Sequence, residues 1–107
     1  FRERLLVSYS IDSQYSNSFF LREEVNDGYY VSGVKTPVAK DGYTFVGWHI
    51  AVVNADGTIT GIGEIFDLAN DTVDSELCNS TGTAIGSTYK MLQLVAVFED
   101  AEGNEVW

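Results

Sequence analysis

Three stretches of the chain show the apolar and polar patterns of β-strands. Over residues 4–11 every second residue from Leu5 is apolar, with Ser8 and Ser10 between them, which predicts a half-buried strand. Residues 43–53 and 91–99 are apolar on both faces, a pattern typical of strands at the centre of a sheet. The chain is therefore expected to fold around a sheet with these last two strands at its centre.

Glycine, proline and polar residues mark the connections. Residues 12–18 are polar and predict a loop, and the Asp-Gly pairs at 27–28 and 41–42 predict turns. Residues 29–34 are aromatic and β-branched, which predicts a further strand. Pro37 is expected to end that regular structure before the next strand begins.

Two glycine-ended tetrads, at residues 54–57 and 100–103, have the composition of tight hairpin turns, so each is expected to lead into a returning strand. Three segments are harder to assign. Residues 19–25 suit either a helical turn or a short strand, and residues 64–77 fit a helical stripe only in part. Residues 79–87 are rich in Ser, Thr and Gly and predict a long surface loop. The pattern predicts a strand-dominated α+β fold with at most one or two short helices.

The length of the chain leaves room for one hydrophobic core. Its 107 residues, 45% of them hydrophobic, match the usual domain of about 100–150 residues. We therefore expect residues 1–107 to form a single domain. Because the chain begins at Phe1 without an initiator methionine, we interpret it as part of a larger multi-domain protein.

The charge of the chain is strongly unbalanced. Sixteen acidic residues against six basic residues give a net charge of −10, and no Lys or Arg lies between Lys40 and Lys90. Such a surface repels phosphate backbones and anionic lipids, so nucleic-acid binding is not expected. Membrane insertion is not expected either, because no apolar run approaches the roughly 18 residues that a span requires. We interpret the acidity mainly as a solvated surface, although it would also attract a basic partner or a cation.

Few residue combinations in the sequence suit catalysis or metal binding. Cys78 and His49 are the only residues of their types, so a Cys/His metal site is not expected, and His49 is interpreted as a structural residue of an apolar strand. The glycines at 61 and 63 lack the third glycine of a dinucleotide-binding loop. The acidic residues of 67–76 are interpreted as a solvated face rather than a calcium site. We expect no catalytic, cofactor-binding or metal-binding residues and no enzymatic activity.

Aromatic residues are abundant, with six Tyr, six Phe and two Trp. Most rings of a small β domain belong to its core, but exposed rings stack on sugars or contact protein partners. The strand pattern leaves four rings without a clear place in the core, and they are candidates for partner binding: Tyr15, Tyr29, Tyr30 and Trp107.

The most specific feature is the run Gly-Tyr-Thr-Phe-Val-Gly-Trp at residues 42–48, hereafter the signature run. It resembles the Gly-Tyr-x-Phe-x-Gly-Trp motif of the Listeria–Bacteroides repeat family, also called the internalin B-repeat. In that family a proline-bearing turn precedes the motif, as Pro37 does here, and a closing strand has a pattern similar to residues 94–98. The positions that carry the resemblance are Gly42, Tyr43, Phe45, Gly47 and Trp48.

The residue types of the signature run indicate a structural role. Strict alternation along the strand would place Tyr43 and Phe45 on one face and would place Val46 and Trp48 on the other. Gly47 would leave room for an aromatic ring to lie over the backbone. These are the properties of a folding motif rather than of a catalytic one.

The resemblance implies a small β-grasp-like (ubiquitin-like) domain of a secreted or cell-wall-attached bacterial surface protein, located outside the cell. Such a domain is expected to act without enzymatic activity, as a spacer or stalk or as a protein-interaction domain in adhesion. Its partner would be a host or bacterial surface protein, or a glycan. The alternative is a carbohydrate-binding accessory module of a secreted enzyme, which an exposed coplanar pair of aromatic rings would favour.

Overall fold

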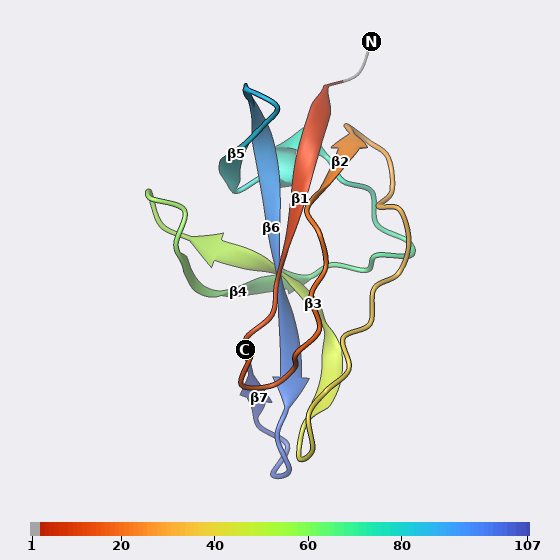
Figure 1. Ribbon diagram of the computed structural model, residues 1–107, viewed down its shortest axis with the longest axis vertical. Coiled ribbons are helices and arrows are strands. Elements are labelled where there is room, and N and C mark those ends of the chain that lie inside the picture. The colour runs from red at the N-terminus through yellow and green to blue at the C-terminus, as the bar shows by residue number, and fades with distance from the viewer. Residues whose placement is uncertain (1–2) are drawn as a thin grey trace.

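A single twisted sheet carries the fold (Figure 1). The computed structural model describes residues 3–107, which form an elongated body of 47 × 28 × 23 Å. In chain order the seven strands are β1 (Arg4–Ser10), β2 (Glu23–Asn26), β3 (Thr44–Val53), β4 (Ile59–Ile65), β5 (Ser80–Ala84), β6 (Ser87–Glu99) and β7 (Glu105–Val106). The one helix among the described residues is the 3₁₀ turn η1 (Ser75–Leu77).

The strands follow the order β2-β1-β6-β3-β4, and β6 lies at the centre. β1 and β6 are parallel, whereas β2 pairs with β1, and β3 with β6 and β4, in antiparallel fashion. β6 is the longest strand, with 13 residues, and its two ends also pair with β5 and β7. Figure 1 shows β6 running along the whole body with β1 beside it. The central positions of β3 and β6 confirm the prediction made from their two apolar faces.

The main apolar cluster lies on one face of the sheet, while residues of the opposite parity, among them Leu6, Val95 and Val97, are buried on the other face. Alternate residues of β1 and β6 point into the main cluster, and Trp48 joins them from β3. Irregular segments cover the face of the main cluster, because Phe20 and Phe66 from the connections pack against it. The buried apolar cluster consists of Leu5, Val7, Tyr9, Val25, Val31, Trp48, Phe66, Leu68, Val73, Leu92, Leu94, Ala96 and Phe98.

Two segments form much of this cover, residues 11–22 and 30–43, and both are largely extended apart from turns at 13–15 and 41–42 and a bend at 32–33. They run antiparallel where Ser16 bridges Ala39, and the Ser16 hydroxyl donates to the carbonyl of Val38 at 2.7 Å. The N–H of Val38 donates in turn to the Ser18 hydroxyl at 2.9 Å. Phe20 contacts the rings of the core. The cover is therefore extended chain, held by serine side chains, rather than a helix.

The predicted turns are confirmed. The glycines of all four predicted turns have positive φ angles, between 84° and 90°, which side chains disfavour. The first strand is confirmed over β1, and the two glycine-ended tetrads close the β3–β4 and β6–β7 hairpins. The strand-dominated class is likewise confirmed, while the helices expected of an α+β fold are reduced to η1 in the described part of the chain.

The strand predicted over residues 29–34 is wrong. Tyr29 forms an isolated bridge with Val73, but the chain then bends at Ser32 and Gly33. The Ser32 N–H donates to a Glu23 side-chain oxygen at 3.0 Å instead of to a neighbouring strand. A side-chain acceptor has thus replaced the backbone partner that a strand needs.

The surface loop predicted over residues 79–87 is also wrong. Residues 80–84 form β5, which pairs with the start of β6 through a two-residue turn. Both turn residues, Ile85 and Gly86, have positive φ angles of 50° and 76°, as the favoured hairpin turns require. An isoleucine is rare at such a position, so its residue type gave no turn signal.

The two ambiguous segments contain neither a long helix nor a long strand. Of residues 19–25, only those from Glu23 belong to a strand, β2. Of residues 64–77, the first two end β4, and η1 forms the last turn. The described residues contain no helix with the length and hydrophobicity that crossing a membrane requires.

Candidate functional site

The signature run begins in a turn and ends in the core. Gly42 has a φ angle of 90°, and the Tyr43 N–H donates to the carbonyl of Lys40 at 3.0 Å to close the turn. Trp48 lies in β3 with only 3% of its surface exposed. Its indole N–H donates to the carbonyl oxygen of Lys35 at 2.8 Å. The run therefore fastens the start of β3 to the extended segment before it.

A β-bulge divides the signature run. Phe45 and Gly47 pair with consecutive residues of β6, so Val46 is an extra residue in β3. The bulge shifts the alternation by one residue, and Phe45 packs in the core beside Trp48, with ring centroids 5.9 Å apart. Val46 is exposed. The expectation that Val46 and Trp48 share a face is therefore wrong, because strict alternation does not allow for a bulge.

The side chain that lies beside Gly47 is aliphatic. A Cβ atom at this position would lie 3.4 Å from the Cδ1 atom of Ile65, which ends β4. The expectation of an aromatic ring over this glycine is therefore wrong. The pairing of Ile65 with His49 brings the end of β4 beside the signature run, and a Cβ atom at position 47 would only touch the tip of the Ile65 side chain.

A polar cluster joins β1, β2 and the segment after β2. The Tyr9 hydroxyl donates to Oε1 of Glu23 at 2.5 Å, and the Lys35 ammonium lies 2.9 Å from the same oxygen. The Ser32 N–H donates to the other carboxylate oxygen of Glu23. The Lys35 ammonium also lies 5.0 Å from the centre of the Tyr9 ring. These contacts hold residues 32–35 against the sheet.

The protonation states of Tyr9 and Glu23 suit a structural role for this cluster, which we call the clamp. Burial raises the pKa of Tyr9 far above its usual range, and the bond to Glu23 adds to the rise. Burial opposes the charged form of Glu23, but hydrogen bonds from Tyr9, Lys35 and Ser32 outweigh it and lower the pKa of the carboxyl group. At neutral pH Tyr9 is thus a fixed donor and Glu23 a fixed acceptor, unlike an acid–base pair poised for proton transfer.

The surface beside the signature run is hollowed into an apolar groove of about 330 Å³. Its exposed apolar side chains are Val34, Val46 and Ile65, and Phe45 and Trp48 line it from the core. Its polar lining residues are Lys35, Thr36 and Asp67. The volume lies at the lower end of the roughly 300–1,000 Å³ that small-molecule sites occupy. We call this feature the signature groove, and its size suits a few side chains better than a large cofactor.

An acidic hollow of about 230 Å³ adjoins the signature groove, since both are lined by Ile65 and Phe66. Three carboxylates line it, from Glu64, Asp71 and Asp74. Within the described part of the chain, no group of His, Cys, Asp and Glu is arranged to hold a metal ion. The hollow thus extends the apolar groove into a surface of negative charge.

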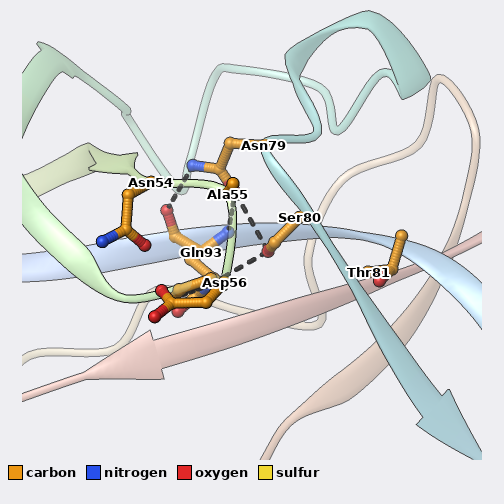
Figure 2. A pocket seen from close by; sticks show the side chains of 8 residues that line it. Asn54, Ala55, Asp56, Asn79, Ser80, Thr81 and Gln93 are labelled. Atoms are coloured by element: carbon orange, nitrogen blue, oxygen red, sulfur yellow. Dashed lines mark hydrogen bonds between the residues drawn. The ribbon is translucent and has the colours of Figure 1, made fainter.

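A separate polar pocket of about 270 Å³ lies between the β3–β4 turn and β5 (Figure 2). The Asn79 amide donates to the carbonyl of Ala51 at 2.7 Å, and its oxygen accepts the Gln93 N–H at 3.0 Å. The Gln93 amide donates to Gly57 and to the Ser80 hydroxyl. Figure 2 shows Asn79, Ser80 and Gln93 joined in one network. These amides tie the β3–β4 turn to β5 and β6.

The four candidate aromatic residues lie in different surroundings. Tyr15 packs against the core, its ring edge-to-face with Tyr43 at 4.9 Å. Tyr29 and Tyr30 are exposed where the chain leaves β2. Trp107 is 39% exposed and borders a shallow hollow beside the end of β1. The structure therefore does not bring the four candidates together into one surface.

Cys78 and His49 have separate roles in the structure. The Cys78 thiol lies 3.8 Å from the carbonyl oxygen of Asp74, and burial raises its pKa to about 11. A protonated thiol is a poor nucleophile. The Nδ1 atom of His49 lies 2.8 Å from the carbonyl oxygen of Gly63 in β4. Each side chain thus has a backbone partner of its own.

No family model, curated protein or solved structure gives a significant match to this chain. The function is therefore argued from the geometry and from the signature run. Sequence reasoning missed the signature groove, because Val34 and Ile65 are 31 residues apart in the chain and only the fold brings them to one hollow. Ile65 belongs to the segment 64–77, whose pattern fits a helical stripe only in part, so no sequence signal marks its place in the groove.

Proposed function

We propose that this chain is a non-enzymatic domain of a secreted or cell-wall-attached bacterial surface protein, related to the Listeria–Bacteroides repeat family. The domain forms part of a stalk that extends from the cell surface, and it binds a protein partner in adhesion. The observation that carries the proposal is the structural role of the signature run, which turns the chain and closes the core. The turn is at Gly42, and Trp48 closes the core through its hydrogen bond to the carbonyl of Lys35.

The strand order supports a β-grasp-like fold. The first and the long central strand, β1 and β6, form a parallel pair, with β2 and β3 on either side. This mixed arrangement agrees with the ubiquitin-like order that the resemblance implies. The extended segments over the core take the place in which such a fold would carry a helix, so the chain would be a variant with an irregular cover.

The state of the reactive groups supports a role without catalysis. The clamp formed by Tyr9, Glu23 and Lys35 is held by internal hydrogen bonds. The Cys78 thiol is half-buried and protonated at neutral pH. An active site would need such groups to face a substrate, with their pKa values near the working pH.

The proposed location at the cell surface is tested on whole cells that make the protein containing this domain. Antibodies raised against the isolated domain are applied to intact and to permeabilised cells, with an antibody to a cytoplasmic protein as the control. The proposal predicts labelling of intact cells that disappears after brief protease treatment. Labelling only after permeabilisation would contradict a surface location.

The carbohydrate-binding alternative is separated by a second experiment. The isolated domain is applied to an array of plant, bacterial and host glycans, and Tyr29→Ala and Tyr30→Ala variants are compared with it. The proposed role in protein interaction predicts no binding that depends on these exposed rings. Glycan binding lost in either variant would favour the accessory-module alternative, because sugars stack on exposed aromatic rings.

A further inference from the structure

We infer that the signature groove and the acidic hollow together form a docking site for a protein segment that carries a bulky apolar residue next to lysine or arginine. This inference deepens the proposed interaction role and rests on it. Val34 and Ile65 leave 65% and 62% of their surfaces in solvent on either side of the groove. Exposed apolar side chains around a hollow are typical of binding surfaces.

The groove offers the apolar part of such a site. Its lining passes from the exposed Val46 and Ile65 to the core residues Phe45 and Trp48, so an inserted side chain would contact rigid, packed groups. Anchors that fill a preformed apolar pocket supply most of the binding energy of many interfaces. The bulge in β3 exposes Val46, and Gly47 lines the groove beside Ile65.

The charge around the groove selects a basic partner. The carboxylates of Glu64, Asp71 and Asp74 line the adjoining hollow, and Asp67 lines the groove itself. One basic residue, Lys35, also lines the groove, but its ammonium group is paired with Glu23 at 2.9 Å and is largely buried. The other ion pairs that the structure describes join Arg4 to Glu24 and Lys90 to Glu3, away from the groove. Apart from Lys35, which Glu23 already neutralises, no Lys or Arg is among the residues that line the groove or the hollow. Lysine or arginine of a partner would therefore compensate the carboxylates of the hollow.

The same charge argues against a second copy of this chain as the occupant. A twofold dimer through this face would bring the acidic residues of both chains into one interface, and each chain carries a net charge of −10. The edge of β4 is also a poor template for strand addition, because its pairing with β3 shifts register twice. Bulges of this kind turn an edge away from regular pairing. We therefore expect the partner to be recognised through its side chains, which enter the groove, rather than through its backbone.

The test is a selection from a random dodecapeptide library displayed on phage, with the isolated domain as bait. Recovered peptides are synthesised with a fluorescent label, and their affinity is measured by anisotropy at low and physiological salt. The inference predicts a shared pattern of a large apolar residue within a few positions of Lys or Arg. It also predicts weaker binding at higher salt, since screening reduces attraction between exposed charges.

Two pairs of variants locate the binding. Ile65→Ser is expected to weaken it about tenfold by removing an apolar wall of the groove, whereas Ile85→Ser, at a 95% exposed isoleucine of the β5–β6 turn, should not change it. Glu64→Gln with Asp74→Asn should weaken binding about fivefold. The control with the same net charge is Glu102→Gln with Glu105→Gln, near the β6–β7 turn. Thermal melts confirm that each variant is folded.

Several results would overturn the inference. They are the recovery of no binding peptide, peptides without basic residues, binding that Ile65→Ser leaves unchanged, or self-association through this face in sedimentation. If the selection fails while antibodies still label intact cells, the docking site is refuted and the surface location stands. If cell labelling fails while peptides bind at the groove, the proposed location is refuted and the docking site stands.

Discussion

Replacing Trp48 by alanine tests the structural role of the signature run. The side chain is 3% exposed and meets the rings of Tyr9, Phe20 and Phe45 at centroid distances of 5.2, 6.1 and 5.9 Å. Truncating a buried tryptophan to alanine costs about 3–5 kcal/mol, and the carbonyl of Lys35 would lose its partner, which adds about 1 kcal/mol. A loss of about 4–6 kcal/mol is a large part of the roughly 5–15 kcal/mol that stabilises a small domain.

The loss is measured by urea denaturation followed by far-ultraviolet circular dichroism. With a slope of about 1–3 kcal/mol per molar urea, the midpoint should fall by about 2 M or the variant should be unfolded without urea. Trp107→Ala is the matched control, because that ring is 39% exposed, and its cost should stay below about 1 kcal/mol. A cost below about 1 kcal/mol for Trp48→Ala would refute the assignment of Trp48 to the core.

Further predictions concern other parts of the chain. Cys78→Ser should keep the fold at a cost of about 1–2 kcal/mol, measured by the same denaturation, because the thiol is only half-buried; an unfolded variant would contradict this. Gly82→Ala should cost about 1–3 kcal/mol, because a Cβ atom there would lie 2.9 Å from the sulfur of Met91, while Gly33→Ala, with open space around it, should cost much less. The pKa of Glu23 is lowered in the folded state. Its contribution to stability is therefore present above the unfolded pKa of about 4.3 and is lost as the pH falls through the folded-state pKa. Glu23→Gln should make the free energy of unfolding decrease less steeply as the pH falls in the acid range. Millimolar calcium should raise the melting temperature no more than sodium chloride of equal ionic strength, and a calcium-specific rise of several degrees would show that the acidic residues are ligands.

The sheet was predictable where burial is encoded in the strand itself. In β1 and β6 the order of apolar and polar residues along the strand itself indicates which positions are buried. The glycine turns require φ angles that few other residues adopt. The bulge at Val46 was not predictable, because the register of β3 depends on its pairing with β6. The turn at Ile85 was missed for a similar reason, since strand pairing holds it against the preference of the residue.

The candidate site was less predictable than the fold. The signature run drew attention to the correct part of the chain, but its glycine at 47 and its exposed valine make a groove only together with Val34 and Ile65. Val34 lies in a connection whose course depends on distant contacts, such as the bond from Trp48 to Lys35. Ile65 ends β4, whose register depends on its pairing with β3. No periodic pattern marks such a surface, because each segment contributes only one or two residues to it.

The most direct test of the central claim, that the signature run builds a docking groove, is a methyl-group NMR titration of the isotope-labelled domain with a peptide from the selection. The account predicts shift changes that saturate together at the methyl groups of Val34, Val46 and Ile65, which line the groove. The methyl groups of Ile85, in the β5–β6 turn, should keep their shifts. Changes centred on another surface, with the groove methyl groups unaffected, would contradict the claim.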